Sequence, residues 1–90
     1  PAPVSALMKQ WDYLYRERTG VPQLRRKGDF WREKSDWITL WDSMGEPIYD
    51  SMNLYFSNAK YAQWGYRFSV FFRVAQELVE TQAKGEWRYN

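Results

Sequence analysis

Apolar residues recur along most of this chain at spacings of three, four and seven, which place side chains on one face of an α-helix. The pattern predicts three helices, over residues 5–18, 30–44 and 58–84. The apolar residues of segment 45–57 show no clear period, so we expect an irregular segment, a turn that leads into a short helical piece. The sequence therefore predicts a single small all-α domain that spans residues 1–90.

The first predicted helix has one continuous apolar face. Ser5 can cap its N-terminus, and Gly20 and Pro22 follow its last turn. The apolar face contains Val4, Leu7, Met8, Trp11, Leu14 and Tyr15. Tyr13 points away from this face, so we expect an exposed aromatic side chain there.

The second predicted helix, which Asp29 can cap, carries more apolar residues than one face needs. Four of them lie within about 60° on a helical wheel and are the expected core: Phe30, Trp37, Trp41 and Met44. Trp31 and Ile38 extend this arc on one side and Leu40 on the other, to about 180°, whereas a surface helix needs somewhat more than about 100°. We therefore expect Trp31 and Leu40 to lie outside the core and to contact a partner.

The third predicted helix would be about 40 Å long at 1.5 Å per residue. Its main stripe contains Tyr61, Trp64, Phe68, Phe71, Phe72, Ala75, Leu78 and Val79. Tyr66 and Val70 lie on the opposite side, so its first half is apolar nearly all round and needs a second cover, either segment 48–56 or another protein. Gly65 in its interior costs about 1 kcal/mol relative to alanine, and we expect another group to approach the backbone there.

The composition favours a protein that is completed by a partner. Aromatic residues make up 20% of the chain, with six tryptophans, and there is no cysteine and no histidine. A chain of this length buries only about 60 to 65% of its unfolded surface, and small domains are usually reinforced by disulfides, a metal or a partner. Disulfides are impossible here and a zinc site nearly so. Trp87 and Tyr89, in the tail after Gly85, are costly to expose, so we expect them to dock against another surface.

The charges change sign along the chain. Residues 1–34 carry eight Lys and Arg against four acidic residues, whereas residues 35–58 carry four acidic residues and no base. Residues 59–90 carry five bases against three acids. This division favours internal charge complementarity, or a docking surface of both signs, over a uniform surface for polyanions.

Few catalytic arrangements are open to this chain. Without cysteine and histidine, the usual activated nucleophiles and general bases are missing. The acidic pairs Asp36 with Asp42 and Glu46 with Asp50 fall at helix ends and turns, where solvated charges are expected, and they do not follow calcium-loop spacing. The five glycines are too dispersed for a phosphate-binding loop. We therefore expect no enzymatic activity, no cofactor, no metal site and no small-molecule substrate.

The most hydrophobic stretch, residues 61–79, is interrupted by Arg67, Arg73 and Glu77, so the sequence predicts no transmembrane helix. The chain does not begin with Met, and we expect that an initiator Met or a leader peptide was removed. The absence of cysteine fits a reducing compartment. We expect an intracellular or organellar protein that is soluble or peripheral to a membrane complex.

Our first hypothesis is a non-enzymatic structural or accessory subunit, or an adaptor, that docks onto a larger protein assembly through exposed aromatic helix faces. Tryptophan, tyrosine and arginine dominate interface hot spots. The expected partner-binding residues are Tyr13, Trp31, Tyr66, Val70, Trp87 and Tyr89. The expected electrostatic contacts are Arg25, Arg26 and Lys27 in the connector after the first helix.

The alternative hypothesis is a small basic nucleic-acid-binding module. Proteins that bind single strands combine a basic groove with rings on which bases stack. Arg25, Arg26 and Lys27 would contact phosphates and Trp31 would stack, although the acidic stretch 36–50 follows directly. The same three bases are a candidate contact for anionic lipid headgroups, although about four to eight are typical of lipid-binding patches.

Overall fold

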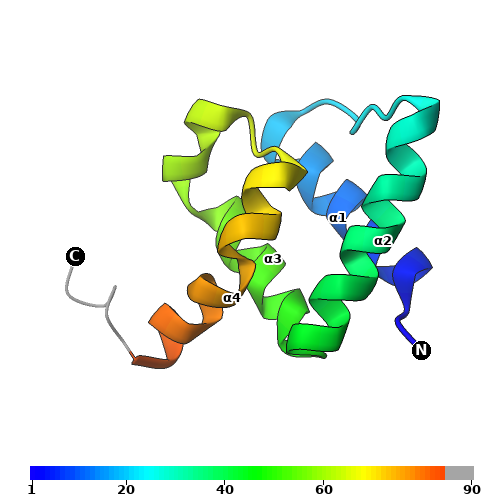
Figure 1. Cartoon of the computed structure of the whole chain (residues 1–90). Helices are drawn as coiled ribbons and strands as arrows, with labels where there is room; N and C mark the ends of the chain where they lie inside the picture. Colours follow the sequence, from blue (N-terminus) through cyan, green and yellow to red (C-terminus); the bar gives the residue numbers. More distant parts are fainter. Residues whose placement is uncertain (85–90) are drawn as a thin grey trace.

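In a computed structural model, the chain folds into five helices within residues 1–84, the part that the structure describes (Figure 1). The helices are α1 Val4–Thr19, α2 Lys27–Met44, α3 Pro47–Ser57, the 3-10 helix η1 Ala59–Trp64, and α4 Phe68–Lys84. No strand occurs in this part of the chain. The predicted all-α class is therefore confirmed, whereas the prediction of about three helices gave too few.

The starts of the first two helices differ from the prediction. In α1, Pro3 rather than Ser5 occupies the N-cap position. Helix α2 begins at Lys27, so Asp29 lies in its first turn and not at its cap. A carboxylate in the first turn still interacts favourably with the helix dipole, and here it accepts a hydrogen bond from Arg26 at 3.3 Å.

Helix α3 lies at the centre of the fold, in contact with α1, α2, η1 and α4 (Figure 1). The predicted turn that leads into a short helical piece is confirmed by the turn at residues 45–46 and the helix that follows it, whereas the description of segment 45–57 as irregular was wrong. The buried face of α3 has helical spacing and contains Ile48, Ser51, Met52, Tyr55 and Phe56. Ser51 interrupts the apolar stripe, and Tyr49 and Leu54, both half-buried, lie off it because several elements surround this helix. Pro47 at the first helical position is the start signal that the apolar pattern obscured.

Helix α3 also supplies the second cover that the C-terminal helix was expected to need. It packs along α4, and the buried hydroxyl of Ser51 donates a hydrogen bond to the carbonyl of Ala75 at 2.6 Å. A buried hydroxyl without a partner would cost about 1 to 3 kcal/mol, so this bond removes a penalty and fixes the register of the two helices. Helix α3 thus covers most of this apolar stripe, of which Trp64 stays exposed.

The single helix predicted over 58–84 is broken by a left-handed turn. Gly65 and Tyr66 have φ angles of 64° and 52°, and their N–H groups bond back to the carbonyls of Ala62 and Tyr61, which ends η1. A β-carbon on Gly65 would meet nothing within 4 Å, so the prediction that another group approaches the backbone there was wrong. Glycine suits this position because side-chain-bearing residues are strained at positive φ.

The same turn directs Tyr66 into the core, where its side chain is only 3% exposed. Its ring stacks on Phe56 at 5.5 Å between centroids. Its hydroxyl accepts a hydrogen bond from Arg18 Nε at 2.8 Å and donates one to the carbonyl of Asn58 at 3.2 Å. The prediction that Tyr66 is an exposed partner-binding residue is therefore corrected, since this side chain holds η1 against α1 and α3.

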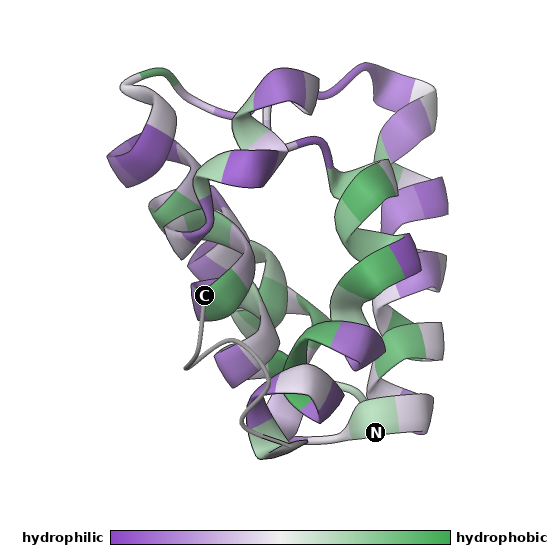
Figure 2. Ribbon diagram, turned by 90° about the vertical axis from the view of Figure 1, so that its left-hand side faces the viewer, coloured by the Kyte–Doolittle hydropathy of each residue, from purple (hydrophilic) through white to green (hydrophobic). Residues whose placement is uncertain are grey.

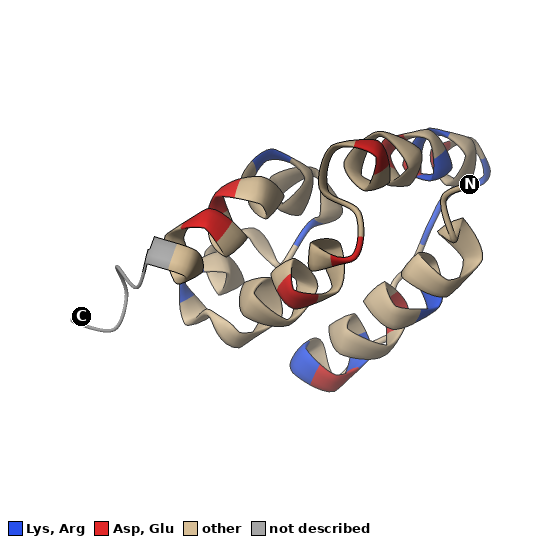
Figure 3. Ribbon diagram, turned by 90° about the horizontal axis from the view of Figure 1, so that it is seen from below, with Lys and Arg blue, Asp and Glu red and all other residues tan. Residues whose placement is uncertain are grey.

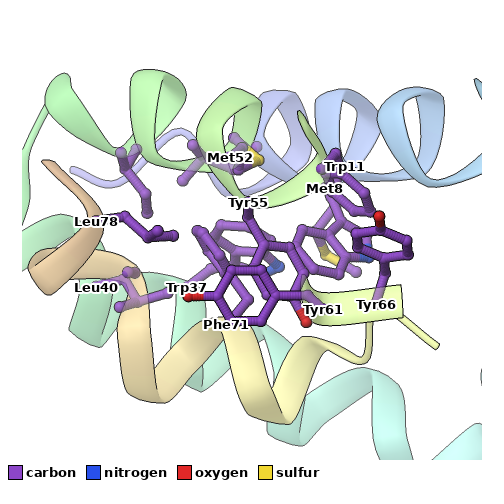
Figure 4. Packing of buried hydrophobic residues seen from close by; sticks show 14 residues of the cluster. Met8, Trp11, Trp37, Leu40, Met52, Tyr55, Tyr61, Tyr66, Phe71 and Leu78 are labelled. Carbon is purple, nitrogen blue, oxygen red and sulfur yellow. The ribbon is translucent and has the colours of Figure 1, made fainter. Parts of the chain in front are cut away.

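Aromatic rings make up a large part of the core, and each of the four α-helices contributes at least one (Figure 4). Trp11 is fully buried, and its ring lies between 4.6 and 5.9 Å from five other ring centroids. These five belong to Trp37, Tyr55, Phe56, Phe68 and Phe71. Its indole N–H donates to Gln23 Oε1 at 3.0 Å, which satisfies its only polar atom. Much of the unusual aromatic content therefore has a structural role.

The buried face of α2 is rotated by about 40° from the predicted one, at about 100° per residue. Glu33 and Leu40 are buried beside Trp37, whereas Phe30 is 40% exposed. Glu33 is held inward because it accepts hydrogen bonds from the Trp37 indole at 3.1 Å and from Arg25. Leu40 was thus wrongly assigned to a partner surface, and Phe30 was wrongly assigned to the core. Figure 2 shows the polar and apolar residues that alternate along the helices.

Tyr55 makes the stability of the fold sensitive to alkaline pH. Burial, together with the neighbouring Tyr61 and Tyr66, raises the pKa of Tyr55, and its hydroxyl donates to the carbonyl of Arg67 at 2.7 Å. In the unfolded chain a tyrosine ionises near pH 10. Because the folded state holds the proton more tightly, this contribution to stability is complete below about pH 10 and is lost as the pH rises towards the higher folded pKa.

We expect the free energy of unfolding to fall above about pH 10, and the fall to be shallower in Tyr55→Phe. Urea titrations at about pH 8 and about pH 11 measure both slopes. At the lower pH the variant should lose about 1 kcal/mol through the missing hydrogen bond. Tyr13→Phe, at an exposed position, is the control and should follow the wild type. An equal fall in wild type and Tyr55→Phe would contradict the assignment.

Candidate functional site

Exposed apolar side chains gather on one face of α2. The large apolar residues that the structure leaves exposed are Tyr13, Val21, Leu24, Phe30, Trp31, Ile38 and Trp64. Single exposed apolar residues are normal on a protein surface. Phe30, Trp31 and Ile38, however, lie within nine residues of one helix. This group is therefore the candidate site.

Helical spacing places Lys27, Trp31, Lys34 and Ile38 in one stripe at i, i+4, i+7 and i+11, in which Lys34 is half-buried and the other three are exposed. The Trp31 side chain is 70% exposed. Lys34 Nζ lies 4.9 Å from the ring centroids of both Phe30 and Trp31, and the two rings meet edge to face at 6.1 Å. Cation–π contacts at exposed sites contribute about 0.5 to 1 kcal/mol, so Lys34 orients the two rings. We call these five residues the Trp31 face.

A groove runs beside the Trp31 face, between the start of α1 and α2. One hollow, of about 520 Å³, is lined by residues 2–5 and 8–9 together with Phe30 and Lys34, and reaches Asp12 and Arg25. A second hollow, of about 420 Å³, is lined by Val4, Trp31, Lys34, Ser35 and Ile38. The two share Val4 and Lys34, so they lie side by side along α2. We call the two hollows together the α1–α2 groove.

Arg25 is an internal cross-link and not an outward contact. Its Nη2 lies 2.6 Å from Asp12 Oδ1 on α1 and 2.9 Å from Glu33 Oε2 on α2, and the side chain is only 15% exposed. Burial alone would lower the pKa of Arg25, but its hydrogen bonds to Glu33 and Asp12 and their charges outweigh burial and raise it. The prediction that Arg25 contacts a partner was therefore wrong, because this cation joins the connector to both helices.

The other two bases of the connector cluster do reach the surface. The Arg26 side chain is 92% exposed and pairs only with Asp29, at 3.3 Å. Lys27 is exposed at the start of α2 and belongs to the Trp31 face. Their contact with a partner stays a prediction.

A second groove, on another side of α2, mixes both charges. It has a volume of about 450 Å³ and lies between the connector, α2 and the start of α4. Its charged residues are Arg25, Arg26, Arg32 and Arg67 and, of opposite sign, Asp29, Glu33 and Asp36. Burial raises the pKa of Asp36, an effect that Arg32 opposes and Glu33 strengthens. Because acids and bases alternate here, this groove is not a uniform site for a polyanion.

The structure separates the other predicted site residues. Tyr13 is exposed, as predicted, but it does not line the α1–α2 groove. Val70 is half-buried and packs against the core. Trp87 and Tyr89 lie outside the described residues. Sequence reasoning missed the role of Lys34, although the helical wheel places it on the same stripe as Trp31.

Comparison with protein-family models, with curated protein sequences and with solved structures finds no match for this chain. Within residues 1–84, no helix has the length and apolar character needed to cross a membrane. In the same part of the chain, the acidic side chains form no group that could hold a metal ion.

Proposed function

We propose that this chain is a non-enzymatic adaptor or accessory subunit that docks onto another protein through the Trp31 face. The observation that supports this best is a 70% exposed tryptophan, oriented by Lys34, beside two further exposed apolar residues and an open groove. Tryptophans in such positions are frequent hot spots of protein interfaces. The C-terminal helix is not the proposed docking surface, because α3 packs along α4.

The binding free energy available at Trp31 depends on the area that its side chain leaves exposed. A tryptophan buries about 150 to 250 Å² when it is fully covered. At about 25 cal/mol per Å², covering the exposed part of this indole contributes about 3 to 4 kcal/mol before the entropy cost of association. Phe30 and Ile38 add to that area on the same face. A partner that covers the Trp31 face therefore buries three neighbouring apolar side chains at once.

Binding of nucleic acid receives less support from the geometry. Arg25, the first base of the proposed phosphate contact, is held inside by two carboxylates. Arg26 and Arg32 line a groove that also contains three acidic residues. Lys27 and Lys34 do flank Trp31, so an oligonucleotide belongs among the probes used below.

Site-specific photo-cross-linking tests the proposed function. A benzoylphenylalanine at position 31 of the full chain, expressed in its native source, should form one dominant cross-linked product with another protein. The same group at Leu24, an exposed apolar residue outside the Trp31 face, is the matched control and should form little. We also expect Trp31→Ala, but not Leu24→Ala, to return the chain from a large native mass to that of the free protein.

Equal cross-linking at positions 31 and 24, or a native mass unchanged by Trp31→Ala, would contradict the proposal. Because Trp31 contributes little to the core, the variant should remain folded, and its helical circular dichroism verifies this.

A further inference from the structure

We infer that the α1–α2 groove receives an acidic amphipathic helix of the partner protein. This inference rests on the proposed docking function and specifies the chemistry of what binds. It follows from the shape of the groove, from the charges around it and from the position of the remaining acidic residues.

The length of the site fits a helix. From Lys27 to Ile38 the stripe advances eleven residues, about 16 Å at 1.5 Å per residue, or about three helical turns. The two hollows lie alongside this stripe and share Val4 and Lys34. A partner helix with apolar residues at i, i+3, i+4 and i+7 would carry an apolar stripe of its own, and this stripe would face Trp31 and the floor of the groove.

The charges around the groove require a partner of negative charge. Lys9 and Lys34 line it, and Lys27 stands one turn before Trp31. Among the described residues that line it, Asp12 is the only carboxylate, and it is already paired with Arg25 at 2.6 Å. Free positive charge therefore surrounds an apolar floor, and a helix flanked by glutamate or aspartate complements it.

The acidic residues of the chain also orient the partner helix. Figure 3 shows acidic residues around the turn from α2 to α3, where the sequence supplies Asp42, Glu46 and Asp50. Asp42 follows Ile38 by one turn on the same stripe. Since like charges repel, the carboxylates of the partner are expected near Lys27 and Lys34, away from Asp42.

A phosphate backbone fits this groove less well. Its floor includes Val4, Met8 and Ile38, which offer no donor to a phosphate oxygen. Three separate lysines supply few phosphate contacts, and binding without base stacking on several rings would be weak. The apolar floor therefore favours a protein segment.

The test uses capped synthetic peptides of about 14 residues, long enough for about four helical turns. Two of the peptides have the same leucine spacing; the acidic peptide has glutamate at all flanking positions and the lysine peptide has lysine there. The third, the proline peptide, has the acidic sequence with a proline at its centre. An oligo-dT of about 15 nucleotides is the fourth probe. Binding to the full chain is followed by the ¹⁵N–¹H signal of the Trp31 indole, which Trp31→Phe identifies.

We expect the acidic helical peptide to shift the Trp31 indole signal and to bind at least about tenfold more tightly than the lysine peptide. The indole signals of Trp11 and Trp37 should move little, because both rings are buried. The proline peptide should bind about tenfold more weakly, and raising NaCl from about 50 to about 500 mM should weaken the acidic peptide severalfold.

Charge reversal gives the matched comparison. Lys9→Glu with Lys27→Glu should abolish the preference for the acidic peptide and leave the Phe30–Trp31 pair intact. Lys60→Glu with Arg73→Glu reverses the same number of charges on exposed residues outside the groove and should preserve it.

Three results would overturn the inference: equal affinity for both peptides, tighter binding of oligo-dT, or a dimer of the chain itself that Trp31→Ala dissociates. The same variants distinguish the failure of this inference from the failure of the proposed docking function. If Trp31→Ala loses the cross-linked partner but Lys9→Glu with Lys27→Glu retains it, docking stands and the acidic helix is wrong.

Discussion

Replacing Arg25 with alanine lowers the free energy of unfolding by about 3 to 5 kcal/mol, the usual cost of removing one member of a buried ion pair. Arg25 and Glu33 expose only 15% and 11% of their side chains, so Glu33 would be left nearly buried without its cation. The loss would also free the connector from α1 and α2. Urea unfolding followed by circular dichroism measures the change.

The neighbouring residue provides the control. Arg26→Ala removes an exposed pair and should change the free energy of unfolding by about 0 to 0.5 kcal/mol. Adding Glu33→Gln to Arg25→Ala should recover part of the loss, because a neutral amide can still accept from the Trp37 indole. If Arg25→Ala proved as stable as Arg26→Ala, the ion pairs would have no structural role.

Arg25→Ala should change the proposed docking site as well as the stability of the fold. With Arg25 removed, Asp12 loses its partner and places a free carboxylate at the edge of the α1–α2 groove. The folded fraction of the variant should therefore also bind the acidic peptide more weakly, since a like charge would face the glutamates. The inward position of Arg25 thus helps to keep the groove positive.

Trp11→Ala is expected to cost about 3 to 5 kcal/mol, because it removes a fully buried ring that contacts five others. A domain of 90 residues has a total stability of about 5 to 13 kcal/mol, so this loss removes a large share of it and should lower the unfolding midpoint strongly. Trp31→Ala should stay within about 0.5 kcal/mol of the wild type. Thermal and urea unfolding of both variants test this contrast.

The pair of variants separates two uses of one residue type. If Trp31→Ala were as destabilising as Trp11→Ala, the indole at position 31 would belong to the core and the docking proposal would lose its main support. If Trp11→Ala were neutral, the aromatic core would be wrongly placed. The high tryptophan content alone does not distinguish these roles, because composition carries no information about burial.

Local periodicity was enough to predict the all-α class, the apolar face of α1 and the exposure of Tyr13 and Trp31. A surface helix packs against the rest of the protein along one side, so its sequence records which side is buried. The buried face of α2 was predicted only approximately. The inward position of Glu33 depends on Arg25, eight residues away, and a helical wheel contains no such interaction.

The tertiary structure decided the features that depend on contacts between distant residues. The extent of helix α3 and its central place in the fold were not predicted, because Ser51 looks polar in the sequence, whereas in the fold its hydroxyl bonds to the carbonyl of Ala75, 24 residues away. The break after η1 was missed because an apolar stripe continues through Gly65, and only the left-handed backbone there ends the helix.

Some features of the candidate site also follow from the sequence, whereas others depend on the tertiary structure. The sequence by itself determined that Trp31 lies outside the core, because its position on the helical wheel of α2 does not depend on the neighbours of that helix. Only the tertiary structure decided that Val4 of α1 lies beside it, that Lys9 lines the adjoining hollow and that Arg25 turns inward. The physical reason is that a groove and its net charge arise from packing two helices together, whereas the exposed side of one helix follows from its own period.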